Sequence, residues 1–203
     1  GHVHSCNGSA VLAIEDPDDT VREKHIHDLL DRVRHTFVER GRESLHVIPQ
    51  EYRLDGHSGN QQPRGLQASR IELCAHMITA DSKILENHGR VVNDAGFRVA
   101  DICFSGVADG HCVLSEEEKK DGVLLVDMGG GVCSYAVYFN NSICYSNVFA
   151  VGGDHITNDL VLGLDLSIAD AERLKRTYSR TISSNDTGSD SRVLEVTTGD
   201  AAV

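Results

Sequence analysis

An apolar segment that ends in an aspartate and a run of glycines is the feature that most constrains how this chain can fold. The segment runs from Val123 to Asp127, and Gly129, Gly130 and Gly131 follow after a single methionine. Short apolar runs that stop at glycines are typical of buried strands. Glycine has no Cβ, so the backbone can turn tightly and approach a ligand closely. The sequence therefore predicts a strand that delivers Asp127 to a tight, ligand-accessible loop.

This loop has the chemistry of a phosphate and magnesium site. Amide N–H groups of a glycine loop can donate to phosphate oxygens, and a carboxylate at a strand end can hold Mg²⁺, usually through water. Taken alone, the pattern is equally compatible with a glycine-rich hairpin in which Asp127 caps a turn. Gly152, Gly153 and Asp154 precede a predicted helix and also leave two interpretations open, an anion site or, more commonly, a plain helix cap.

The remaining sequence predicts an α+β module before the loop and two helices after it. Helical spacing of apolar residues indicates helices over 20–40, 81–95 and 106–114, and strand-like runs lie at 10–14, 44–54, 68–79 and 98–104. A polar, glycine-bearing loop is expected over 55–65, between the second and third of these runs. Asn140 and Asn141 separate two further apolar runs, which is a hairpin signal. We expect a module over 1–104, a connecting helix within 105–121, a partial second domain over 122–178 and a mobile polar tail over 179–203.

Composition and charge narrow the function. Asp and Glu outnumber Lys and Arg by 31 to 19, and such a surface repels the phosphate backbone, so a nucleic-acid partner is not expected. No apolar run approaches the roughly 18 residues that a membrane-spanning helix needs. The six cysteines lack the paired spacing of a zinc site, and we expect reduced core thiols of a cytoplasmic protein.

Several motifs occur in unbroken order along residues 1–178. They are Leu45–Tyr52, Leu54–Gly56, Pro63–Leu66, His76–Thr79, Gly96–Val99, Val113–Glu118, Asp127–Gly131 and Gly152–Asp159. In this order they closely resemble the signature of the FtsA family of bacterial cell-division proteins. The resemblance implies a partial actin-like (ribonuclease H-like) fold of α+β and α/β character, in which residues 1–104 match the inserted SHS2-type subdomain 1C and residues from about 122 begin subdomain IIA.

The resemblance also implies a nucleotide site in the intact protein. Asp127 and Gly129 to Gly131 match the second phosphate loop, which holds the phosphates of ATP and Mg²⁺, with Asp127 toward the metal. Gly152 to Asp154 match the turn that closes near the nucleotide. The family usually continues with Thr-Thr-Asp after the glycines, where this chain has Val132-Cys133-Ser134, so hydrolysis should be weakened more than binding. No catalytic residue is assigned.

The resemblance begins and ends inside the family pattern. We therefore expect the first phosphate loop, the adenosine loop and the amphipathic C-terminal membrane helix to lie outside this chain, which alone should bind ATP poorly and be inactive. The family implies a scaffold on the cytoplasmic face of the inner membrane whose partners are FtsZ, other division proteins and further copies of itself. An actin-fold ATPase or kinase relative and the pilus-assembly relative of FtsA stay open as alternatives.

Overall fold

The computed structural model describes residues 2–16 and 18–179, which fall into two compact units. Unit 1 consists of the residues up to Asp127 together with Cys133–Phe149. Unit 2 consists of Met128–Val132 together with the described residues from Ala150 to 179. From residue 180 on, the expected tail lies outside the described residues. The domain boundaries expected at 104, 121 and 178 stay predictions.

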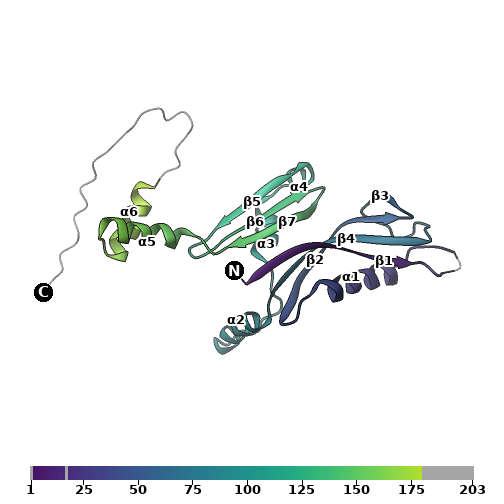
Figure 1. Cartoon of the computed structure of the whole chain (residues 1–203), viewed down its shortest axis with the longest axis horizontal. Helices are drawn as coiled ribbons and strands as arrows, with labels where there is room; N and C mark the ends of the chain where they lie inside the picture. Colours follow the sequence, from purple (N-terminus) through teal and green to yellow (C-terminus); the bar gives the residue numbers. More distant parts are fainter. Residues whose placement is uncertain (1, 17, 180–203) are drawn as a thin grey trace. The chain divides into compact units, whose positions relative to one another are not determined.

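A four-stranded antiparallel sheet forms the first half of unit 1 (Figure 1). Its strands are β1 (Val3–Ala13), β2 (Arg42–Leu54), β3 (His57–Asn60) and β4 (Arg70–Asp81), in the order β1-β4-β2-β3. Pro49 is accommodated inside β2 because the register with β4 shifts between Pro49 and Glu51. The segment 55–65, expected to be a loop, instead contains β3. Asp55 and Gly56, at φ of 48° and 86°, supply the two left-handed residues of a tight hairpin turn.

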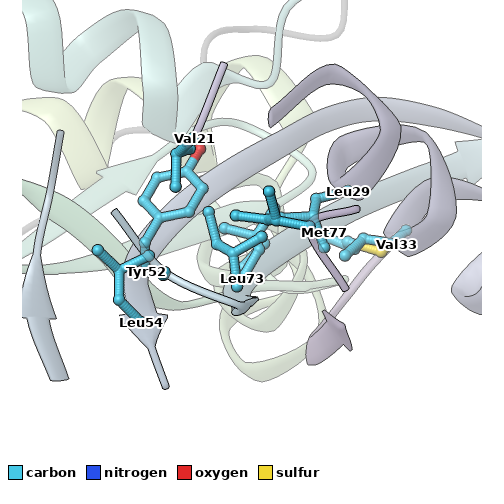
Figure 2. Close-up of a cluster of buried hydrophobic side chains, with 11 residues drawn as sticks. Val21, Leu29, Val33, Tyr52, Leu54, Leu73 and Met77 are labelled. Carbon is cyan, nitrogen blue, oxygen red and sulfur yellow. The ribbon is translucent and has the colours of Figure 1, made fainter. Parts of the chain in front are cut away.

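Helix α1 (Glu23–Phe37) packs on this sheet and completes its hydrophobic core. Leu29 and Val33 on the helix are fully buried, as are Leu73 and Met77 on β4 (Figure 2). Burying a side chain of this size contributes about 1.5–3 kcal/mol before the entropy cost of ordering it. The apolar residues whose helical spacing predicted α1 are therefore the residues that the helix packs into this core.

The segment after β4 corrects one expectation. Helix α2 (Ser82–Asp94) starts as predicted, and the Asp81 carboxylate accepts hydrogen bonds from the N–H groups of Lys83 and Ile84 at 3.0 and 3.2 Å. The strand expected over 98–104 is wrong, because these residues are irregular. The backbone N–H of Phe104 donates to His46 Nε2 at 3.0 Å, and the buried Phe104 side chain packs at the start of the next helix.

A second sheet completes unit 1, with the order β5-β6-β7 (Figure 1). Its strands are β5 (Val123–Met128), β6 (Cys133–Phe139) and β7 (Ser142–Phe149), and the short helices are α3 (Ser105–Val113) and α4 (Glu116–Asp121). The expected hairpin is confirmed, since Asn140 and Asn141 turn the chain at φ of 51° and 62°. A small core of Ala136, Tyr138 and Ile143 is separate from the core under α1.

The cysteines do not behave as core thiols, so that expectation is wrong. All six are free, but Cys6, Cys103 and Cys112 are exposed and the other three are only partly buried. Cys6 takes an outward position on β1, and Cys103 lies in the irregular segment before α3. An apolar neighbourhood in sequence did not decide the side of the backbone on which each thiol lies.

Unit 2 pairs helix α5 (Gly153–Leu164) with helix α6 (Ile168–Tyr178) beside the loop Met128–Val132. Ser167 caps α6, and its hydroxyl accepts a hydrogen bond from the N–H of Asp170 at 3.1 Å. None of the helices in residues 2–16 and 18–179 combines the length and apolar character needed to cross a membrane.

Candidate functional site

The glycine loop is closed and braced by hydrogen bonds within unit 2. The N–H of Gly129 donates to the carbonyl of Val132 at 2.9 Å and closes a tight turn. The N–H groups of Gly153 and Asp154 then donate to the carbonyls of Gly129 and Gly130 at 3.0 and 2.8 Å. The first turn of α5 therefore holds the loop by hydrogen bonds to the carbonyl oxygens of the loop.

The loop and the turn at Gly152 approach too closely for a side chain at this position. A Cβ on Gly152 would lie 2.3 Å from the carbonyl oxygen of Gly130 and 2.5 Å from that of Gly129. A Cβ on Gly130 would meet the carboxylate of Asp154 at 3.1 Å. A Cβ on Gly131 would meet nothing within 4 Å. Packing alone thus requires glycine at 152, while Gly131 is left facing open space.

The amides available to a ligand are those at the tip of the loop. Gly130 and Gly131 are exposed, and within the described ranges their N–H groups have no hydrogen-bond partner. Gly153 and Asp154 differ, because their N–H groups are already bonded to the loop. Of the predicted site residues in unit 2, Gly130 and Gly131 can donate to phosphate oxygens, and Gly152, Gly153 and Asp154 hold the loop in place.

Asp127 belongs to unit 1 and lies near the end of β5. Its Oδ2 accepts a hydrogen bond from the buried hydroxyl of Ser134 at 3.3 Å, and Ser134 is bonded in turn to the hydroxyl of Ser105 at 2.9 Å. The Ser134 hydroxyl therefore orients the Asp127 carboxylate. Across the described residues no group of three or more acidic, His or Cys side chains is arranged to enclose a metal.

Three residues that sequence reasoning missed support the first turn of α5, one of them on α5 itself and two on α6. Lys175 Nζ donates to the carbonyl of Gly153 at 3.0 Å and to Thr157 Oγ1 at 2.8 Å, and it pairs with Glu172 Oε2 at 2.7 Å. Hydrogen bonds from Lys175 and then from Thr157 lower the pKa of the Glu172 carboxyl to about 2. The spacing of Glu172 and Lys175 on one helix was a readable signal, but their partner on α5 was not.

Models of two protein families match the chain. The SHS2 domain inserted in FTSA matches residues 1–79, and Cell division protein FtsA matches residues 124–202. Cell division protein FtsA of Pseudomonas aeruginosa is 31% identical over 178 residues, which cover 88% of this chain and 42% of the relative. The Bacillus subtilis protein of the same name is 30% identical over 196 residues, covering 97% of this chain and 44% of the relative. The Escherichia coli K12 protein is 29% identical over 174 residues, with coverages of 86% and 41%.

A solved structure supports the fold. A chain of the PilM-PilN type IV pilus biogenesis complex superposes with a TM-score of 0.52, covering 86% of this chain and 48% of that chain at 14% identity. The fold and the SHS2 match define an actin-like protein with an inserted SHS2 domain, which confirms the expected fold class. Within this class, the chain belongs to the FtsA family of cell division proteins. It spans about two fifths of the length of the curated relatives it matches.

Proposed function

We propose that this chain is the part of an FtsA-type division scaffold that carries the inserted SHS2 module and the second phosphate loop of an ATP site. The observation that supports this most is the braced glycine loop, in which Gly130 and Gly131 keep free, exposed amides while Gly153 and Asp154 fix the loop. Such a loop needs no reorganisation to accept phosphate oxygens. The residues present therefore fit the phosphate groups of a nucleoside triphosphate.

In the intact protein, bound Mg²⁺ would neutralise phosphate charge, and each residue here has a definite part in holding the nucleotide. Gly130 and Gly131 would donate their amides to phosphate oxygens. Asp127 would hold a hydrated Mg²⁺, with its carboxylate oriented by Ser134. Ser134 is a weaker group than a carboxylate for polarising water, so we propose binding with slow turnover and a role as a scaffold more than as an enzyme.

The scaffold role follows from the family. We propose that the intact protein links FtsZ filaments to the cytoplasmic face of the inner membrane at the division site and recruits later division proteins. The matches to division proteins over most of this chain support that role above a kinase or a pilus platform, because the PilM likeness at 14% identity concerns the fold alone.

Nuclear magnetic resonance titration of this chain with millimolar Mg-ATP tests the site. We expect the amide signals of Gly130 and Gly131 to shift. The affinity of this chain for Mg-ATP should be weak, because a protein with an actin-like fold holds its nucleotide with loops from two lobes. Asp127→Asn should reduce the magnesium dependence of the shifts. Asp165→Asn, at the far end of α5, is the matched control. Absence of shifts at the glycines, or shifts centred elsewhere, would contradict the proposed site.

Self-association is the second property to test. Leu124 and Val126 on β5, an edge strand of its sheet, are 60% and 48% exposed, which supports contact with another copy. Sedimentation over a concentration series should show association that Leu124→Asp reduces. A strictly monomeric chain at high concentration would count against this part of the proposal.

A further inference from the structure

A polar seam joins strand β7 to the four-stranded sheet within unit 1. His76 Nε2 on β4 is 2.8 Å from the hydroxyl of Ser146 on β7. Asn7 Nδ2 on β1 donates to the carbonyl of Cys144 at 3.0 Å, and the hydroxyl of Ser5 donates to the carbonyl of Ser146. We call Asn7, His76 and Ser146 the clasp, because their side chains bond to one another in series across two sheets.

The hydrogen-bonding capacity of the clasp defines its protonation state. His76 Nδ1 is bonded to Asn7 Oδ1, which can only accept, so Nδ1 carries the proton. Nε2 is then the acceptor for the hydroxyl hydrogen of Ser146. His76 is only 1% exposed, and burial lowers its pKa to about 4, so the ring is neutral at physiological pH. Both ring nitrogens are satisfied by partners from different strands.

The hairpin β6–β7 is fastened at its turn as well as at the clasp. The hydroxyl of Ser142 donates to the carbonyl of Pro49 at 2.8 Å, and Gln50 Nε2 donates to the carbonyl of Ile143 at 3.1 Å. Gln61 Nε2 donates to the carbonyl of Asn140 at 2.8 Å. Side chains of the four-stranded sheet and of its β3–β4 loop thus hold the hairpin from its turn to the middle of β7.

The seam is held by polar contacts more than by a shared hydrophobic core. The two hydrophobic cores are separate, and among the described side chains of the four-stranded sheet Ile48 is the one that packs against the smaller core. An open pocket of about 610 Å³, lined by Asn7, Gln50 and Cys144 among others, gives water access beside the clasp. Hydrogen bonds that water can reach open locally more readily than a buried hydrophobic core does.

The hairpin is also the direct continuation of the glycine loop. Val132 ends the loop and β6 starts at the next residue, while β7 ends at Phe149, three residues before Gly152. We propose that the clasp couples the inserted module to the phosphate loop, because fastening β6–β7 to the four-stranded sheet restrains both chain segments that form the loop. The hydrogen bonds of the seam are themselves the evidence for this restraint on the loop. Only the consequence of the restraint for nucleotide binding rests on the proposed function.

Hydrogen–deuterium exchange of this chain without nucleotide tests the coupling. Ser146→Ala leaves His76 Nε2 buried without its partner, and we expect exchange to rise about tenfold at the hydrogen-bonded amides of Gly129, Gly153 and Asp154, with α1 unchanged. Asn7→Ala, at an exposed position of the clasp, should act in the same direction with less effect on packing. Thr36→Ala removes a hydroxyl bonded only within α1 and is the matched control.

Three results would overturn the proposal. They are exchange that rises only in β7 and its immediate neighbours, exchange that rises over the whole chain in both variants, and a control that loosens the loop equally. A second experiment adds Mg-ATP to the wild-type chain, where coupling requires that ligand binding at the loop slows exchange around the clasp. If ATP does not bind, the nucleotide-free comparison still decides the coupling, so the two proposals fail separately.

Discussion

Lys175 Nζ on α6 donates a hydrogen bond of 2.8 Å to Thr157 Oγ1 on α5, and this contact locks the two helices at the end that braces the glycine loop. The same ammonium group bonds the carbonyl of Gly153, whose N–H is bonded to the carbonyl of Gly129. A chain of hydrogen bonds therefore runs from the last turn of α6 to the predicted phosphate loop. The helix pair is the support of the loop.

Replacing Lys175 with methionine should loosen this support. The substitution keeps the apolar stem but removes a largely buried ammonium that bonds Gly153, Thr157 and Glu172. We expect about 1–3 kcal/mol less protection of the α5–α6 pair against local opening, measured by amide exchange over residues 153–178. Lys83→Met, at an exposed position on α2, should leave that region unchanged. Equal effects of the two variants would contradict the role of Lys175.

Alanine at Gly152 should displace the loop. The new Cβ would meet two carbonyl oxygens within 2.5 Å, so the backbone must move. We expect altered amide signals at Gly129 and Gly130 and loss of any Mg-ATP response. Gly131→Ala meets nothing within 4 Å and should preserve the loop. If both variants retain wild-type spectra, the close approach is not a requirement of this loop.

Protonation of His76 should make stability depend on pH. The pKa of His76 is lowered from 6.5 to about 4 in the folded chain, so the unfolded chain binds more protons between these values. The free energy of unfolding should therefore fall as the pH falls from 6.5 toward 4, by up to about 3 kcal/mol. Urea unfolding across this range measures the slope. His76→Gln should make the slope shallower by removing the contribution of His76, whereas His27→Gln, an exposed variant, should leave the slope unchanged.

Truncation of Leu73 should destabilise the inserted module. Leu73 is fully buried in the core under α1, and Leu→Ala at such sites typically costs about 2–5 kcal/mol. Phe97→Ala, at a site 72% exposed, should change the free energy of unfolding by less than about 0.5 kcal/mol. Denaturant midpoints of the two variants provide the comparison, and similar losses would place Leu73 outside the cooperative core.

Local sequence signals predicted most of the elements. The Asn140–Asn141 pair predicted its hairpin because both residues tolerate positive φ. Asp55–Gly56 carries a signal of the same kind, which indicates a hairpin turn inside the segment expected to be a loop. The expected strand at 98–104 failed because an apolar run does not by itself secure a pairing partner. The cysteines failed for a similar reason, since neighbouring apolar residues do not say which side of a strand is buried.

By itself the sequence determined the family, the helices and most strands, and the position of the glycine loop, because periodicity, turn residues and ordered motifs act over a few neighbouring residues. Tertiary structure alone decided which amides stay free, with Gly153 and Asp154 bonded to the loop and Gly130 and Gly131 open. It also decided the contact of His76 with Ser146, which are 70 positions apart. Such pairs depend on how separate elements pack, and no local spacing encodes the direction in which two distant side chains meet.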